Sequence, residues 1–418
     1  MYSGGNPNVW ISNSYSNDGV RNIQDSIKDV QILGPGAVVY NGSGQPGFDI
    51  PQELINEIGS GTADSDTNVT DPNFEIPSEW KYALGLTFIT ESEYVLMADL
   101  LYTDKQDAAV VQNLAFEEIG TAPDGRPVYS GVNHGRNNDF LLTNVKGDSG
   151  DTTVLSFAVS KEYENGLSVT ASYAYTDAND VHPMTNSVAF SNYHKIAAVD
   201  SENPGVATSN YEIPHRFTLN VSYVHEFIDG YETQFSLFGQ ANQTSPYSYN
   251  FDSNSGGFGR YHDEHSELLY VPTENDPLVV YSSAFTSEID GNGNEKISDL
   301  ELFNNFIESE GLTRGQIMDR NELDGSWWTK FDIRVEQKIP GFREGDNASA
   351  FLVVENFGNM LNDDWGVLKQ GSALQSAVQS SVTDAGLYSF DSFSKPTAQS
   401  RQTDASLWEI RIGVKYDF

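Results

Sequence analysis

The sequence predicts an all-β chain: an antiparallel transmembrane β-barrel with about nine of its strands in these 418 residues, long extracellular loops and one short loop helix. Three observations predict this fold class. Nine stretches alternate between apolar and polar residues, and the connections between them are short and long in turn. No apolar run approaches the ~20 residues that a membrane-spanning helix needs.

The clearest alternating stretch, 407–418, ends the chain. One face of a strand would carry Trp408, Ile410, Ile412, Val414, Tyr416 and Phe418. The other face would carry Glu409, Arg411, Gly413, Lys415 and Asp417. A soluble sheet also shows such a pattern, but a strand of about ten residues rimmed by aromatic side chains suits a bilayer better. The closing Phe resembles the C-terminal signal by which outer-membrane barrels are recognised for insertion.

Eight further stretches have the period of two that is typical of strands with two unlike faces. They are 80–90, 94–103, 152–163, 167–176, 215–227, 231–240, 329–339 and 348–356. In the first of them Trp80, Leu84 and Phe88 share one face.

The connections alternate in length. Short ones lie at 90–93, 164–166, 228–230 and 340–347, and long ones at 104–151, 177–214, 241–328 and 357–405. Gly, Asn and Asp in the short ones supply the positive φ that tight turns require. If Phe418 is periplasmic, the reversal of direction at each strand places all four short turns at the periplasmic rim.

Nine strands are an odd number, which would force a parallel seam in a closed barrel. We therefore divide the chain into an N-terminal extracellular loop-like segment, 1–79, and a C-terminal partial barrel, 80–418. The residues after Met1 show neither the basic region nor the apolar stretch of a signal peptide. We expect a fragment of a longer polypeptide, with more strands upstream.

The composition excludes some function classes. A formal net charge of −37 argues against nucleic-acid binding, which needs basic patches. The acidic residues concentrate in the long connections, where they either bind cations or reflect a saline habitat, and we favour the second. The absence of cysteine excludes a disulfide scaffold and thiol chemistry.

One segment, 290–301, is similar to a calcium-binding loop. Its ligands would be Asp290, Asn292, Asn294, the carbonyl of Lys296, Ser298 and Glu301. Glu295 stands where a glycine normally allows the sharp turn. The same residues also predict a capping box, in which Ser298 and Glu301 open a helix that ends at Gly311. Both interpretations stay open, and Ca²⁺ is the one cofactor we expect.

Three weaker groups have a structural interpretation that we prefer. Tyr261 to His265 carries two His and two acids that could bind a transition metal, but solvated loop residues are the simpler interpretation. Residues 362–365 form either a cation site or a turn that places Trp365 at the membrane edge. The charges expected on the lumen side predict cross-strand ion pairs: Arg216, Lys330, Asp332, Arg334, Glu336, Glu355, Glu409, Arg411 and Lys415.

Seven segments together resemble one family. They are SGGNPNVWISN (3–13), IPSEWKY (76–82), LYVPT (269–273), RGQIMDRN (314–321), FDIRVEQKIPGF (331–342), VENFGNMLNDDWG (354–366) and the terminal strand. The combination resembles the C-terminal part of the Oar-like TonB-dependent outer-membrane receptors of Gram-negative bacteria.

The resemblance implies a 22-stranded barrel plugged by an N-terminal domain, with a periplasmic TonB box. The plug, the TonB box and the first barrel half have no counterpart in these residues. The expected partners are therefore outer-membrane lipid, the plug and barrel half of a parent chain, the TonB complex through that parent, and an unidentified ligand.

Two other functions compete with a transporter. A secreted, calcium-stiffened β-sandwich adhesin would have the same alternation but would need no aromatic rims and no terminal Phe. A barrel hydrolase would need rim groups such as His262 and His265. We expect no enzyme, because the sequence contains no nucleophile elbow, phosphate loop or zinc motif.

Overall fold

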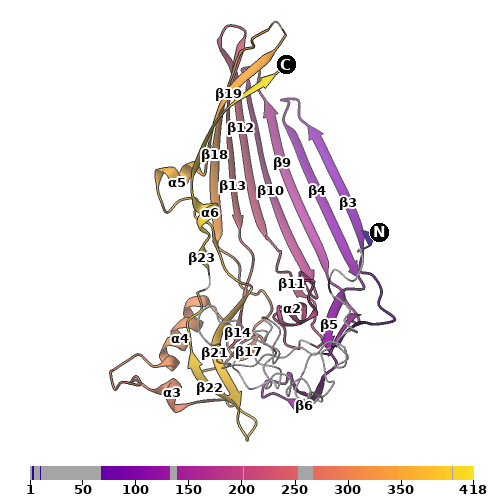
Figure 1. Ribbon diagram of the computed structural model, residues 1–418, viewed down its shortest axis with the longest axis vertical. Coiled ribbons are helices and arrows are strands. Elements are labelled where there is room, and N and C mark those ends of the chain that lie inside the picture. The colour runs from indigo at the N-terminus through magenta and orange to yellow at the C-terminus, as the bar shows by residue number, and fades with distance from the viewer. Residues whose placement is uncertain are drawn as a thin grey trace, which may run out of the picture.

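The computed structural model describes Tyr2, Ser3, Trp10 and residues 67–131, 139–200, 202–252, 267–343, 345–397 and 399–418. Nine long strands dominate this part of the chain (Figure 1). They are β3 (Ser78–Ile89), β4 (Val95–Gln106), β9 (Asp151–Glu162), β10 (Leu167–Asp180), β12 (His215–Ile228), β13 (Tyr231–Gln243), β18 (Trp327–Pro340), β19 (Asn347–Glu355) and β24 (Glu409–Asp417). The predicted all-β class and all nine predicted strands are confirmed.

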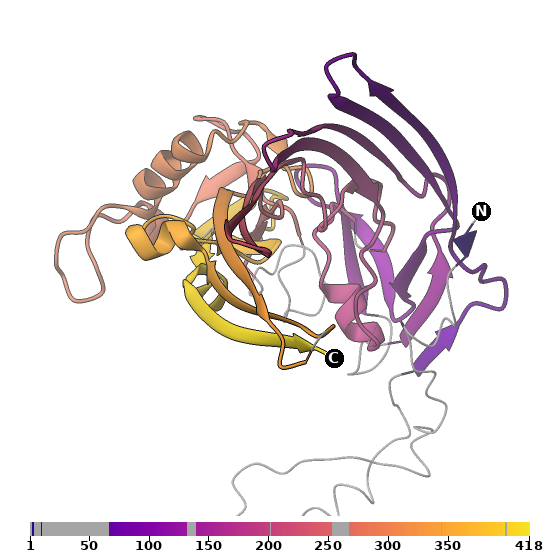
Figure 2. The same cartoon turned by 90° about the horizontal axis from the view of Figure 1, so that it is seen from above.

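The nine strands pair in chain order, and every pair is antiparallel. A two-residue strand, β1 (Tyr2–Ser3), pairs with β3, and β11 (Ala207–Thr208) pairs with the end of β10. Within the described residues β24 and β3 do not pair with each other, so the sheet is an open arc (Figure 2). No helix among these residues is long and apolar enough to cross a membrane.

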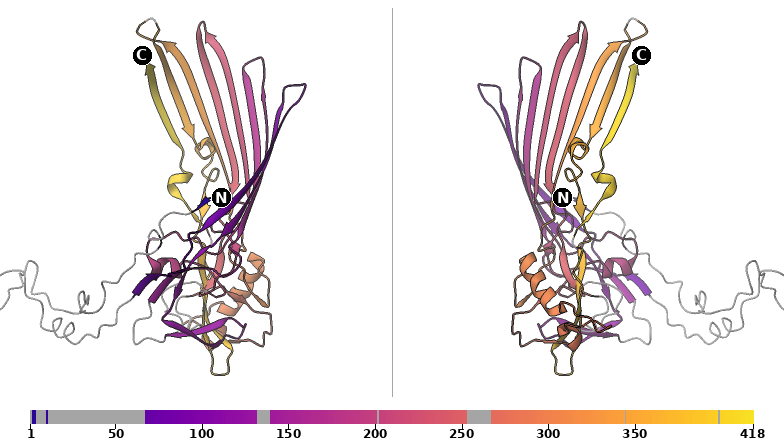
Figure 3. Two further views of the ribbon diagram at one scale, coloured as in Figure 1. Left: turned by 90° about the vertical axis from the view of Figure 1, so that its right-hand side faces the viewer. Right: turned by 90° about the vertical axis from the view of Figure 1, so that its left-hand side faces the viewer.

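The two ends of the sheet differ, as the lengths of the connections predict. Four short turns and the C-terminus lie at one end, which we call the turn rim (Figure 1). The long connections 107–150, 181–214, 244–326 and 356–408 gather at the other end, the loop rim (Figure 3). One turn requires its glycine: Gly166 has φ +87°, and a Cβ there would lie 2.1 Å from the carbonyl oxygen of Val224. Only glycine fits this turn without strain.

The strand register aligns the apolar residues of all nine strands on one face, which we call the apolar face. Leu100 faces Leu84 on one side and Leu155 on the other, and Leu352 faces Val335 and Ile412. All of these side chains except the half-buried Val335 are exposed; Leu84 is 70% and Ile412 81% accessible. The described residues therefore place no second sheet or helical layer against the apolar face, and a water-soluble protein rarely leaves so large an apolar patch uncovered.

The long connections are not structureless. The described part contains five helices where one was predicted, and the connections fold into small sheets. The largest sheet has the order β14 (Ser248–Phe251), β21 (Leu374–Val382), β22 (Tyr388–Phe393) and β16 (Val279–Tyr281). Smaller pairs are β15 (Tyr270–Val271) with β17 (Gln316–Ile317), β20 (Lys369–Gln370) with β23 (Ser400–Arg401), and β6 (Phe116–Thr121) with β7 (Pro127–Gly131). Three of the unpredicted helices are α3 (Ser283–Thr286), α5 (Phe357–Leu361) and α6 (Thr403–Ser406).

The four-stranded sheet, α3 and α4 (Asp299–Glu310) form a loop subdomain shared by the connections 244–326 and 356–408. Its core is aromatic. Phe390 is fully buried, and its ring lies about 6 Å from the rings of Phe251, Phe285 and Phe303. The predicted helix is present, and Phe303, Phe306 and Ile307 of α4 are buried in this core.

The other two connections join the same structure. A three-stranded sheet of β2 (Thr67–Thr70), β8 (Asp139–Asn144) and β5 (Ala109–Asn113) packs with α2 (Ala189–His194) in a second small core. Arg126 of the β6–β7 hairpin is buried; it pairs with Asp124 and donates a 2.7 Å hydrogen bond to the carbonyl of Leu268. Several loops are thereby fixed to one another at the loop rim.

Replacing Phe390 by Ala should destabilise the loop subdomain by about 3–5 kcal/mol, because a buried aromatic side chain is lost and a cavity remains. Hydrogen exchange and limited proteolysis should show faster opening of 244–326 and 356–408, with the nine long strands unchanged. Phe342→Ala is the matched control, because Phe342 is 94% exposed at the turn rim. Equal effects of the two substitutions would contradict the described core.

Candidate functional site

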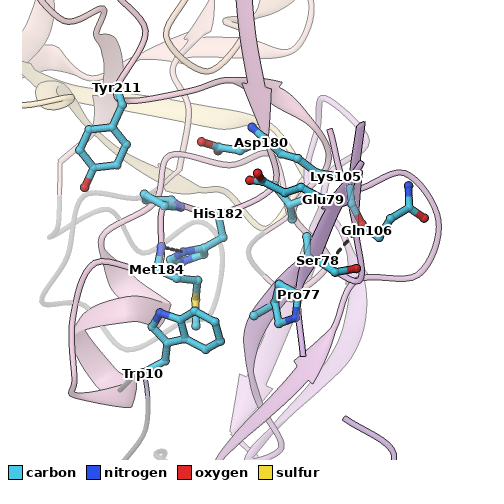
Figure 4. A pocket seen from close by; sticks show the side chains of 15 residues that line it. Trp10, Pro77, Ser78, Glu79, Lys105, Gln106, Asp180, His182, Met184 and Tyr211 are labelled. Carbon is cyan, nitrogen blue, oxygen red and sulfur yellow. Dashed lines mark hydrogen bonds between the residues drawn. The ribbon is translucent and has the colours of Figure 1, made fainter. Parts of the chain in front are cut away.

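A cavity of about 500 Å³ lies where the nine-stranded sheet meets the loops (Figure 4). We call it the rim cavity. Its wall includes the loop-rim ends of β3, β4 and β10 and the segment 181–184 that follows β10. Ala108, Ala109 and Ser149 of the connection 107–150, and the side chains of Trp10 and Tyr211, complete it. A volume of this size is typical of small-molecule sites.

Antiparallel pairing brings the charged groups of the rim cavity together. Glu79 of β3 lies directly opposite Lys105 of β4, and Asp180 ends β10. Figure 4 shows the side chains of Glu79, Lys105 and Asp180 converging at one side of the cavity. Each is partly buried, so the charges interact more strongly than they would in bulk water.

Both carboxylates are already paired with other cations. Glu79 forms a 2.9 Å ion pair with Lys81 of the same strand. Asp180 forms a 2.8 Å ion pair with Arg320, whose buried guanidinium also donates to the carbonyls of Val181, Ala207 and Thr208. The ammonium of Lys105 donates to the carbonyl of Asn179 at 2.5 Å. Among the described residues no carboxylate lies within ion-pair distance of it.

His182 is held in one tautomer. Its Nδ1 accepts a 2.9 Å hydrogen bond from the backbone N–H of Met184, so its Nε2–H donates to the carbonyl of Asn192 at 2.6 Å. Burial lowers the pKa of His182 to about 4, with Arg320 acting in the same direction and Asp180 opposing it. The ring is therefore neutral near pH 7. Its hydrogen bond to the Met184 N–H stabilises the backbone at Met184, which has a positive φ of 43°.

The remaining wall is largely apolar. Pro77, Val181 and Met184 line it beside the ring of Trp10. Ser78 is only 4% exposed, and the part of the chain that the structure describes offers its hydroxyl no hydrogen-bond partner. A buried hydroxyl without a partner is unusual, since most are satisfied by protein or water.

The face opposite the apolar face carries the predicted lumen charges, but their pairing differs from the prediction. Most pairs join residues two apart on one strand: Lys330–Asp332, Arg334–Glu336, Arg411–Glu409 and Lys415–Asp417. Two pairs join neighbouring strands, as predicted: Arg411–Glu355, at 2.9 Å, between β24 and β19, and Lys338–Glu232 between β18 and β13. Residues i and i+2 share a face of a strand, so these pairs form without the neighbouring strand.

The predicted calcium loop is split between two local structures. Asp290, Asn292 and Asn294 lie in one exposed turn, where the carboxylate of Asp290 accepts from the N–H groups of Asn292 and Asn294 at 2.8 Å. Hydrogen bonds from Asn294 and Asn292 hold the pKa of Asp290 below its usual value. The positive φ belongs to Gly293, not to Glu295, the position at which a calcium loop needs it.

The second half of that segment starts a helix. Ser298 is the N-cap of α4 and accepts from the N–H of Glu301, while Gly311 closes the helix in the left-handed conformation. The predicted capping and C-terminal glycine are confirmed. The side chain of Lys296 pairs with Asp299 at 3.0 Å. Calcium binding stays a prediction, because Asp290, Ser298 and Lys296 each have a structural role without it.

Two candidates remain. Residues 261–265 lie outside the described residues. Residues 362–365 form a turn in which Asn362 accepts from the N–H groups of Asp364 and Trp365. Trp365 is 56% exposed beside the end of the sheet.

Three comparisons with known proteins were made. No family model matches the chain, and no curated protein matches it. Among solved structures, the chain is similar to the crystal structure of the outer membrane transporter YddB from Escherichia coli, with 12% identity and a TM-score of 0.35. The match covers 84% of this chain and 34% of the other, so the chain spans about a third of that transporter's length.

Acidification should destabilise the segment that His182 holds. The unfolded chain takes up a proton near the ordinary His pKa of 6.5, whereas the folded protein does so only near 4. The stability contributed by the neutral ring is therefore complete above pH 6.5 and falls, by at most ~3 kcal/mol, as the pH drops to about 4. Hydrogen exchange at the Met184 amide, followed from pH 7 to 4, measures it. In His182→Gln this pH dependence should be weaker; identical profiles would refute the assignment.

Calcium, if it binds at 290–301, should slow hydrogen exchange in the first turn of α4 in the unmodified chain. In Asp290→Ala the effect should disappear, since a carboxylate at the first ligand position contributes charge and two possible oxygen ligands. Asp384→Ala, at an exposed acid elsewhere in the loops, is the control. The same calcium response in all three proteins would exclude this site.

Proposed function

We propose that this chain is the C-terminal barrel portion of a TonB-dependent outer-membrane transporter of the Oar-like kind, which takes up an unidentified ligand. The supporting observation is the uncovered apolar face that runs across all nine strands. Lipid acyl chains would cover it, and the opposite, charged face would line a wetted lumen.

The dimensions of the apolar face suit a bilayer. Near the loop rim it ends in Trp80, Trp327 and Trp408, and near the turn rim in Phe88 and Phe227, all exposed. From Trp408 to the terminal Phe418 the chain extends ~33 Å at about 3.3 Å per residue. A strand tilt of about 40° reduces this to ~25 Å, which is the height of the apolar band of outer-membrane barrels.

The proposal also assigns an orientation. The turn rim would face the periplasm and the loop rim the exterior, where the rim cavity would form part of a ligand-binding mouth. The plug and the remaining barrel strands would come from a parent chain, which alone would contact the TonB complex. We propose no enzymatic activity and no nucleic-acid binding.

The adhesin alternative requires a second sheet against the apolar face. The part of the chain that the structure describes places none there, and the loop subdomain packs at the loop rim instead (Figure 3). We therefore favour the membrane-embedded function.

Two neighbouring substitutions test the proposal. Leu84 points to the apolar face, and Ala83, its neighbour in β3, points to the opposite face. Leu84→Arg should destabilise the bilayer-inserted chain by about 2–4 kcal/mol, because it places a charge among acyl chains, whereas Ala83→Arg should have little effect. Urea titration in lipid vesicles measures both. Equal costs, or a chain that stays monomeric in water without detergent, would falsify the proposal.

A further inference from the structure

We propose that the rim cavity binds a small organic carboxylate, with the carboxylate on Lys105 and the apolar body against Pro77, Val181, Met184 and Trp10. The inference rests on the proposed function, because it names the ligand class of the mouth of that transporter. It begins from the charges at one side of the cavity.

Among the charged side chains at the cavity wall, Lys105 is the cation that is available to a ligand. Glu79 is neutralised by Lys81 and Asp180 by Arg320, whereas Lys105 contacts a backbone carbonyl. A partly buried ammonium that donates one of its three N–H groups keeps two for a ligand. Lys81 and Arg320 lie outside the lining, so the two carboxylates that line the cavity are offset from behind and Lys105 is the cation that faces it.

The buried hydroxyl of Ser78 also favours an acceptor-rich ligand. Among the described residues it has no hydrogen-bond partner, and it lies on the same side of the cavity as Lys105 (Figure 4). A carboxylate has two oxygens and accepts from an ammonium and a hydroxyl at once. An ammonium ligand would instead compete with Lys81 and Arg320 for carboxylates that are already paired.

The apolar part of the wall favours a ligand with a hydrophobic body. Pro77, Val181 and Met184 offer no hydrogen bonds, and burial of an apolar group against them contributes in proportion to the area removed from water. The acidic loops repel anions at long range. At physiological ionic strength, however, the screening length is about 8 Å, so contacts inside the cavity outweigh distant charges.

Matched probes test the inference on the full chain in detergent micelles: 3-phenylpropionate, its neutral amide 3-phenylpropanamide, and 3-phenylpropylamine. Calorimetric titration should show the carboxylate binding about tenfold more tightly than the amide, since one charge-assisted hydrogen bond in a partly buried site is worth about that factor. The amine should bind most weakly. If the carboxylate and the amide bind with equal affinity, the proposal is overturned before any variant is made.

Substitutions then locate the site. Lys105→Met should remove the preference for the carboxylate and leave amide binding unchanged, and Lys105→Arg should retain most of it. Lys161→Met is the matched control, because Lys161 also donates to a backbone carbonyl, that of Ser92 at 2.6 Å, but lies at the turn rim. A preference that survives in Lys105→Met, or is lost in Lys161→Met, contradicts the assignment.

The failure of this inference is distinct from the failure of the proposed function. If Leu84→Arg weakens insertion as expected while the carboxylate shows no preference, the membrane assignment stands and the ligand class is wrong. If the chain does not insert but the preference is found, the cavity is a carboxylate site in a protein of another kind.

Discussion

The constraint on which this structure depends is the strand register, which gives nine consecutive strands the same two faces. Side chains alternate along a strand, so a slip of one residue in any pair would move its apolar residues to the charged face. The observed pairs, such as Leu84 with Leu100 and Leu352 with Ile412, keep the apolar face continuous. The irregularity in the β12–β13 pair lies between His225 and Ile228, at the turn rim, where it shifts nothing further along the strands.

The long strands could be predicted because each carries its two faces in its own sequence. The loop subdomain could not, because three of its four strands have six residues or fewer and their partners are remote. Ser248 pairs with Leu374 and Val279 with Tyr388, over separations of more than a hundred residues. Stretches this short carry too little alternation to identify a strand. Helix α4 was predictable because its N-cap, apolar face and closing glycine are all local signals.

The same distinction applies to the site. The turn at Asp290 follows a local spacing and could be found in the sequence. The rim cavity could not, since it joins the ends of β3, β4 and β10 with Arg320, which reaches Asp180 from 140 residues away. Lys105 lay in a predicted connection, two residues beyond a predicted strand, with no motif around it. Lys105 is available to a ligand because Lys81 and Arg320 form ion pairs with Glu79 and Asp180. These ion pairs cannot be predicted from the sequence.

The direction of the edge strands limits what could close the sheet. Seven strands lie between β3 and β24, so these two run in the same direction, from the loop rim to the turn rim. A second copy placed edge to edge in the same orientation would set β24 beside β3 in parallel, in a sheet that is otherwise antiparallel. A closed barrel in which all neighbouring strands are antiparallel requires an odd number of further strands. The first and the last of these would run from the turn rim to the loop rim. The short strand β1 pairs with β3 in this antiparallel sense. The open edges thus suit antiparallel strands, which a second copy supplies only if its strand direction is reversed.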